Sequence, residues 1–143
     1  VDYSSMTVDE ICRLPVSIRA NADCFLWLWT TNAHLPVAFE VIEAWGFTYK
    51  TTLTWFKDKV GVGHWLRGQT EHCLLAVKGN PTIMLTGQST ALQGEVREHS
   101  RKPEEFYKLV ETLCPGAKLE MFGRAPREGW VVWGAESDKF STP

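Results

Sequence analysis

Glu71, His72 and Cys73 are three consecutive residues whose side chains can bind metal ions or transfer protons. They follow a segment of glycines, a tryptophan and basic residues, and they open an apolar stretch that ends at Gly79. This pattern predicts a β-strand, in which neighbouring side chains point to opposite faces of the sheet. No second group of ligands occurs at the spacing typical of zinc sites. We therefore predict no metal site here, and we interpret His72 and Cys73 as packing residues.

A second group of polar residues surrounds the segment from 58 to 70, where three glycines interrupt the apolar pattern. Its positive charge is carried by Lys57, Lys59, His64 and Arg67. Cations beside glycines suit the phosphates around an extruded base, whereas many such clusters are only solvated surface. The nearby Trp55 and Trp65 can either stack on nucleotides or belong to the core.

The composition predicts a single globular domain over residues 1–143, with a net charge of −2 and therefore no overall basic character. The four cysteines contain no Cys-x-x-Cys pair, which favours reduced thiols in a cytosolic protein. No run of about 18 apolar residues and no charged, apolar leader is present, so we expect neither a membrane span nor a signal peptide. The expected location is the cytoplasm, or the nucleus in a eukaryote.

Strands and helices are predicted to alternate along the chain. The expected helices are a short one after a Thr7 to Glu10 capping box, one over 32–46, and one from Pro103 at position N1 to Leu113. The expected strands cover 23–30, 47–57, 71–78, 94–98, 117–124 and 129–134, with a loop over 82–93. This order predicts an α/β fold with a mostly parallel central sheet flanked by helices. Ligands of such sheets bind beyond the carboxyl ends of the strands.

Six short motifs then occur in order: "GHWL", "EHCL", "VKGNP", "SRKPEEFY", "LCPGAKLEMFGR" and "GWVVWG". Through them the chain resembles the MT-A70 family of adenine N(6)-methyltransferases over almost its whole length. The resemblance implies a Rossmann-like methyltransferase fold, S-adenosylmethionine as cofactor, and methylation of the exocyclic amine of adenine in DNA or RNA. We favour DNA, because no RNA-binding appendage such as a zinc finger is visible. The resemblance also implies a homodimer or a paired family subunit. No membrane partner is expected, because no long apolar run is present.

The resemblance assigns roles to single residues. It places Glu71 and Tyr3 at the substrate adenine, and Lys102 at the methionine carboxylate of the cofactor. A cation beside a helix N-terminus does favour an anion there. The other implied cofactor residues are Gly123, Arg124, Ala135 and Glu136. Ala135 stands where the family usually has asparagine, so one hydrogen bond to the cofactor should be absent.

The Asp-Pro-Pro-Trp motif that characterises the family is absent from these 143 residues. In the family this motif binds the target amine and stacks on the adenine ring, shortly before the position of Tyr3. We favour the interpretation that the domain is N-terminally incomplete. The alternative is a catalytically inactive family member that acts as a nucleic-acid-binding or subunit scaffold. A third reading is a nucleotide-binding α/β protein of other function.

Overall fold

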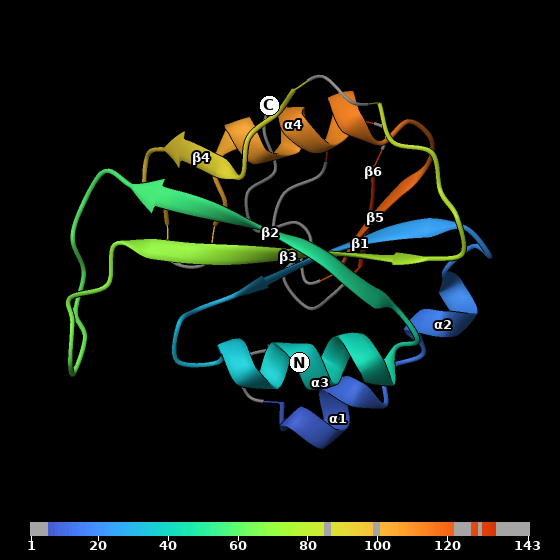
Figure 1. Ribbon diagram of the computed structural model, residues 1–143, viewed down its shortest axis with the longest axis horizontal. Coiled ribbons are helices and arrows are strands. Elements are labelled where there is room, and N and C mark those ends of the chain that lie inside the picture. Colours follow the sequence, from blue (N-terminus) through green and yellow to red (C-terminus); the bar gives the residue numbers. More distant parts are fainter. Residues whose placement is uncertain (1–5, 85–86, 99–100, 122–126, 129, 134–143) are drawn as a thin grey trace.

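The computed structural model describes residues 6–84, 87–98, 101–121, 127–128 and 130–133 (Figure 1). Their elements are, in order, α1 (Val8–Cys12), α2 (Val16–Arg19), β1 (Cys24–Thr30), α3 (Leu35–Ala44), β2 (Thr48–Lys57), β3 (Thr70–Lys78), β4 (Ala91–Gly94), α4 (Glu104–Leu113), β5 (Lys118–Met121) and β6 (Trp130–Trp133). The predicted α/β class is confirmed. Figure 1 shows α4 on one face of the larger sheet and α1 and α3 on the other.

The larger sheet is mixed, with strand order β1-β3-β2-β4. Strand β3 is antiparallel to both β1 and β2, whereas β2 and β4 are parallel. The prediction of a mostly parallel central sheet is therefore not confirmed. The reason is the connection over 58–69, which contains no helix and joins β2 to its neighbour β3 as a hairpin, and strands joined in this way are antiparallel. The smaller sheet pairs β5 with β6 in parallel.

The reversed direction of β3 brings its first residues to the edge where β1 and β2 end. Along this edge Glu71 is paired with Trp55 of β2, and His72 is paired with Thr30 of β1. A chemical group at the start of β3 therefore lies at the carboxyl ends of the two neighbouring strands. This is the edge at which the ligands of α/β folds bind.

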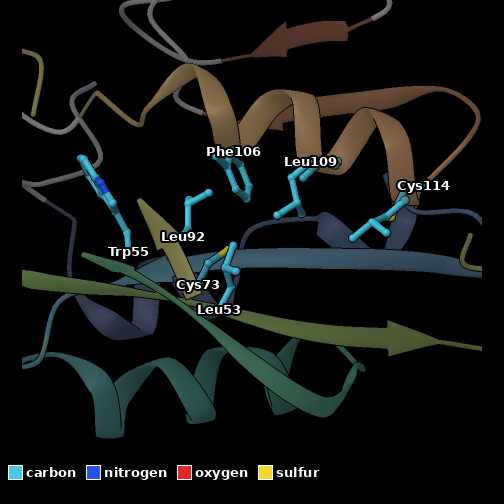
Figure 2. Close-up of a cluster of buried hydrophobic side chains, with 9 residues drawn as sticks. Leu53, Trp55, Cys73, Leu92, Phe106, Leu109 and Cys114 are labelled. Atoms are coloured by element: carbon cyan, nitrogen blue, oxygen red, sulfur yellow. The ribbon is translucent and has the colours of Figure 1, made fainter. Parts of the chain in front are cut away.

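The sheet is buried on both faces, as the apolar run of β3 requires. On the α4 face, Phe106 and Leu109 point from the helix toward Leu53, Cys73 and Leu92 of the sheet (Figure 2). On the α3 face a second cluster contains Val41, Ile42, Trp45, Leu74 and Ala76. Neighbouring residues of β3 thus supply two different cores. Each core holds one helix in place.

Several local predictions are confirmed and others are wrong. The Thr7 hydroxyl accepts the Glu10 amide at 3.1 Å and the Glu10 carboxylate accepts the Thr7 amide, so the capping box is formed. The strand expected over 94–98 is wrong, because β4 covers Ala91–Gly94 and so overlaps it only at Gly94, the rest of β4 lying in the segment predicted as a loop. Leu92 of β4 is buried in the core beside β2, and this long-range packing has no periodic signal in such a short segment. Pro103 is the N-cap of α4 rather than its first helical residue.

Within the described part of the chain, no helix has the length and apolar character needed to cross a bilayer.

Candidate functional site

Glu71 lies between two lysines at the carboxyl edge of the larger sheet. Its Oε1 is 2.8 Å from the Lys102 ammonium, and its Oε2 is 2.8 Å from the Lys57 ammonium. The Glu71 side chain is 12% exposed, against 15% for Lys102 and 25% for Lys57. We call these three residues the Glu71 cluster. The sequence analysis assigned Glu71 to the adenine, Lys102 to the cofactor and Lys57 to phosphates. The structure brings these three side chains together.

The cluster keeps Glu71 ionised. Burial by itself raises the pKa of the Glu71 carboxyl, but the charges and hydrogen bonds of Lys102 and Lys57 outweigh burial, so that its pKa is lowered. A carboxylate has about four lone-pair positions, and two ammonium groups leave some of them available. Glu71 can therefore still accept a hydrogen bond from a third donor.

Two tryptophans support the lysines from the core side. The Lys102 ammonium is 5.0 Å from the centroid of the Trp29 ring, and the Lys57 ammonium is 5.2 Å from that of Trp55. These distances allow cation–π attraction, which adds to the pairing with Glu71. The Trp55 side chain is 2% exposed and its indole N–H donates to the Gly94 carbonyl at 2.9 Å. The sequence left open whether Trp55 stacks on nucleotides or packs in the core, and the structure supports core packing.

The segment before α4 positions Lys102. The backbone N–H of Val96 donates to the Asp58 carboxylate at 2.8 Å, which ties this segment to the end of β2. The Arg97 guanidinium donates to the backbone carbonyl of Lys102. Sequence reasoning missed Asp58 and Arg97, because neither contact follows from local spacing. The one available signal in the sequence was that a polar residue, Asp58, directly follows the end of β2.

His72 and Cys73 have different roles in the sheet. Cys73 is fully buried, and burial raises the pKa of its thiol well above the ordinary value, in agreement with a neutral packing residue. His72 does more than pack: its Nδ1 lies 2.9 Å from the Thr54 hydroxyl, and its Nε2 lies 2.8 Å from Oδ1 of Asn32. The imidazole thus joins β3 to β2 and to the end of β1. Among the described residues, no group of three potential ligands could hold a metal ion.

The connection between β2 and β3, residues 58–69, carries the other predicted nucleic-acid contacts and is called the 58–69 loop below. Lys59, His64 and Arg67 are exposed in this loop, which projects beyond the sheet at the left of Figure 1. Its stem is closed by two hydrogen bonds: the Gly61 N–H donates to the Gly68 carbonyl at 2.6 Å, and the Gly68 N–H donates to the Val62 carbonyl at 3.1 Å. Trp65 is 98% exposed, so the core alternative for this residue is wrong.

A cleft of about 490 Å³ opens next to the Glu71 cluster, beyond the carboxyl ends of β2 and β4. We call it the β2–β4 cleft. Its lining consists of Phe56, Lys57, Asp58, Gln69, Gln93, Gly94, Glu95 and Glu105. Lys57 belongs both to this lining and to the Glu71 cluster. A ligand in the cleft and a ligand at Glu71 would therefore be neighbours.

Comparison with known proteins identifies the family of the chain. The family model for MT-A70 matches residues 1–136. The chain belongs to the MT-A70 family. MT-A70 methyltransferases use S-adenosylmethionine as methyl donor.

Three relatives show the range of MT-A70 proteins to which the chain is similar. It is 35% identical to the human N(6)-adenosine-methyltransferase catalytic subunit METTL3, over 95% of this chain and 25% of that protein. It is 35% identical to the N(6)-adenosine-methyltransferase MT-A70-like of Arabidopsis thaliana, over 92% of this chain and 21% of that protein. It is 30% identical to the type II methyltransferase M.MunI of a Mycoplasma species, over 94% of this chain and 59% of that protein. The chain thus spans about a quarter of the length of the first two relatives.

Five residues that the MT-A70 resemblance assigned to the site, Tyr3, Gly123, Arg124, Ala135 and Glu136, lie outside the described residues. Their roles remain predictions. The chemistry of the described residues does fit the cofactor: Lys102 stands at the start of α4 and presents an ammonium group, which suits a carboxylate. This ammonium has three donor hydrogens, so the bond to Glu71 does not exhaust it.

Proposed function

We propose that this MT-A70 chain is part of an enzyme that transfers a methyl group from S-adenosylmethionine to the exocyclic N(6) amine of adenine in a polynucleotide. The observation that carries the proposal is the Glu71 cluster, an ionised carboxylate held between two lysines at the ligand-binding edge of the sheet. We further propose that the chain forms a Rossmann-like methyltransferase domain.

The target amine is a poor nucleophile, because its lone pair is delocalised into the adenine ring. Catalysis then depends on positioning and electrostatics more than on proton transfer before attack. Glu71 accepts a hydrogen bond from the N(6) amine and orients it. This carboxylate also stabilises the positive charge that the amine gains as it is methylated.

The other described residues of the site bind the cofactor and the nucleic acid and orient Glu71. Lys102 holds the carboxylate of the cofactor, whose sulfonium supplies the methyl group. Lys57 holds Glu71 in its orientation, and the exposed Lys59, His64 and Arg67 bind phosphates around the extruded adenine. Cofactor contacts by Gly123, Arg124, Ala135 and Glu136, a substrate contact by Tyr3, and a homodimer or paired subunit belong to the same proposal.

The test is methyl transfer by the full-length protein to matched single-stranded and duplex DNA and RNA, followed by mass spectrometry of the nucleosides. N(6)-methylated deoxyadenosine or adenosine is the expected product, and the comparison decides between DNA, which we favour, and RNA. Nucleic-acid binding without any methylated product would overturn the enzyme proposal. It would instead support an inactive scaffold.

A further inference from the structure

One face of α4 packs on the smaller sheet through polar and aromatic side chains. Glu104, Tyr107 and Glu111 stand at positions i, i+3 and i+7 of the helix and therefore share this face. The Tyr107 hydroxyl donates to Oε1 of Glu120 in β5 at 2.7 Å. The Trp130 indole N–H, at the start of β6, donates to Oε2 of Glu111 at 2.8 Å. The helix is thus joined to both strands of the smaller sheet.

Arg127 lies in the connection between β5 and β6 and contacts the same face of α4. Its Nη1 is 2.5 Å from the carboxylate of Glu104, which is the first residue of the helix. Its Nε and Nη2 donate to the two carboxylate oxygens of Glu111 at 2.6 and 2.9 Å. The guanidinium also lies 5.2 Å from the centre of the Tyr107 ring, which allows cation–π attraction. A single side chain therefore holds both the first and the last turn of α4.

The contact between Arg127 and Glu104 lies at the end of α4 that carries Lys102. Lys102 directly precedes the N-cap of the helix, two residues before Glu104. This contact therefore fixes the backbone next to Lys102. Tyr107, in the same half of the helix, bonds to Glu120, the next-to-last residue of β5. The carboxyl end of β5 thus lies beside the N-terminal half of α4, and ligands of α/β folds bind beyond such strand ends.

We propose that Arg127 is a positioning residue for cofactor binding: it holds the first turn of α4 against the smaller sheet and so directs the Lys102 ammonium toward the carboxylate of S-adenosylmethionine. The inference rests on the proposed function, in which Lys102 binds that carboxylate. Glu71, on the larger sheet, attracts the same ammonium at 2.8 Å. Because the attraction between charges falls with distance, the position of the first turn of α4 decides how Lys102 is shared between the two anions. Arg127 acts through Lys102 and is not itself a catalytic residue.

The experiment measures the affinity for two ligands that differ at the carboxylate. S-adenosylmethionine carries this group, whereas 5′-methylthioadenosine has the same nucleoside but lacks the amino-acid part. Isothermal titration calorimetry compares the full-length protein with Arg127→Met, Lys102→Met, the double variant and Arg127→Lys. Arg127→Lys keeps the charge but loses the planar fork that reaches two carboxylates. Ile42→Val, in the core on the α3 face, is the control for a loss of stability that leaves α4 untouched.

We expect Arg127→Met to weaken S-adenosylmethionine binding about tenfold and to change 5′-methylthioadenosine binding by less than about twofold. Arg127→Lys should bind S-adenosylmethionine with an affinity between those of Arg127→Met and the parent. In the Lys102→Met background, Arg127→Met should cause little further loss, because both substitutions remove the same contact. Ile42→Val should lower the melting temperature and leave both affinities unchanged.

A purely structural role of Arg127 would give a different pattern. Equal weakening of both ligands by Arg127→Met, or a loss that adds in full to that of Lys102→Met, would overturn the inference. A parent protein that binds S-adenosylmethionine no better than 5′-methylthioadenosine would overturn it too. These binding measurements decide the inference whether or not adenine is methylated. A parent that shows the expected binding pattern but forms no methylated adenine contradicts only the proposed function.

Discussion

The ammonium of Lys102 lies 2.8 Å from Oε1 of Glu71, although the two residues are 31 positions apart in the chain. This ion pair joins the residue before the N-cap of α4 to the second residue of β3. Lys57 completes the pairing from the last residue of β2. The candidate site is therefore held by three elements at once, and loss of one partner should affect the other two.

The first prediction concerns stability. Lys102→Met should lower the free energy of unfolding by about 2 kcal/mol, because a partly buried carboxylate then keeps only one of its two cations. In a Lys102→Met/Glu71→Gln double variant the loss should be smaller than the sum of the two single losses. Urea unfolding measures all four proteins, with Lys108→Met on the exposed side of α4 as the control. Additive losses would show that the two residues do not interact.

The second prediction concerns catalysis. Glu71→Gln keeps the shape of the side chain but removes its charge, so methyl transfer should fall by about a hundredfold. The affinity for S-adenosylmethionine should be unchanged or higher, because Lys102 no longer has Glu71 as a competing anion. Single-turnover rates and isothermal titration calorimetry separate the two effects, with Glu43→Gln as the control. A weaker cofactor affinity with an unchanged rate would contradict the role assigned to Glu71.

The third prediction concerns the 58–69 loop. Removing two exposed cations with Lys59→Ala/Arg67→Ala should weaken nucleic-acid binding for all sequences alike. It should also make the negative slope of log affinity against log salt concentration less steep by about two. The melting temperature should stay within about 2 °C of the parent, since neither side chain is buried. A double variant of Lys50 and Lys108, exposed elsewhere, serves as the control, and an equal loss of affinity there would argue against a specific role of the loop.

The fourth prediction concerns the pH dependence of stability. Glu111 accepts hydrogen bonds from Arg127 at 2.6 and 2.9 Å and from the Trp130 indole at 2.8 Å. These bonds, led by Arg127, lower the pKa of Glu111 from 4.5 to about 2. Because the folded-state pKa is the lower one, the stabilisation is complete above about pH 4.5 and is lost as the pH falls toward 2.

The corresponding experiment compares the melting temperature of the parent with that of Glu111→Gln between pH 7 and pH 2.5. The difference should be constant down to about pH 5 and then shrink steadily as the pH falls. Thr112→Ala, at the neighbouring exposed position of α4, should show no such trend. A difference that grows on acidification would mean that the pKa shift has the opposite sign.

Much of the local structure could be predicted from the sequence, because it follows from nearest-neighbour physics. The β-branched and aromatic run that ends at Lys57 and the apolar run of β3 identify two strands. The capping box at Thr7 starts α1. Six short residue motifs, four of them around Glu71 and Lys102, also led to the family that the comparison then established. Each of these signals lies within a few residues of the feature that it predicts.

The tertiary structure alone decided how these parts are combined. Periodicity reports which face of a strand is buried, but it contains no information on the direction of its neighbour. The antiparallel direction of β3 is what brings Glu71 to the ends of β1 and β2. The same long-range packing separates the buried Trp55 from the exposed Trp65, two residues that the sequence could not distinguish. The Glu71 cluster and the β2–β4 cleft exist because distant segments meet, and such contacts have no local signature.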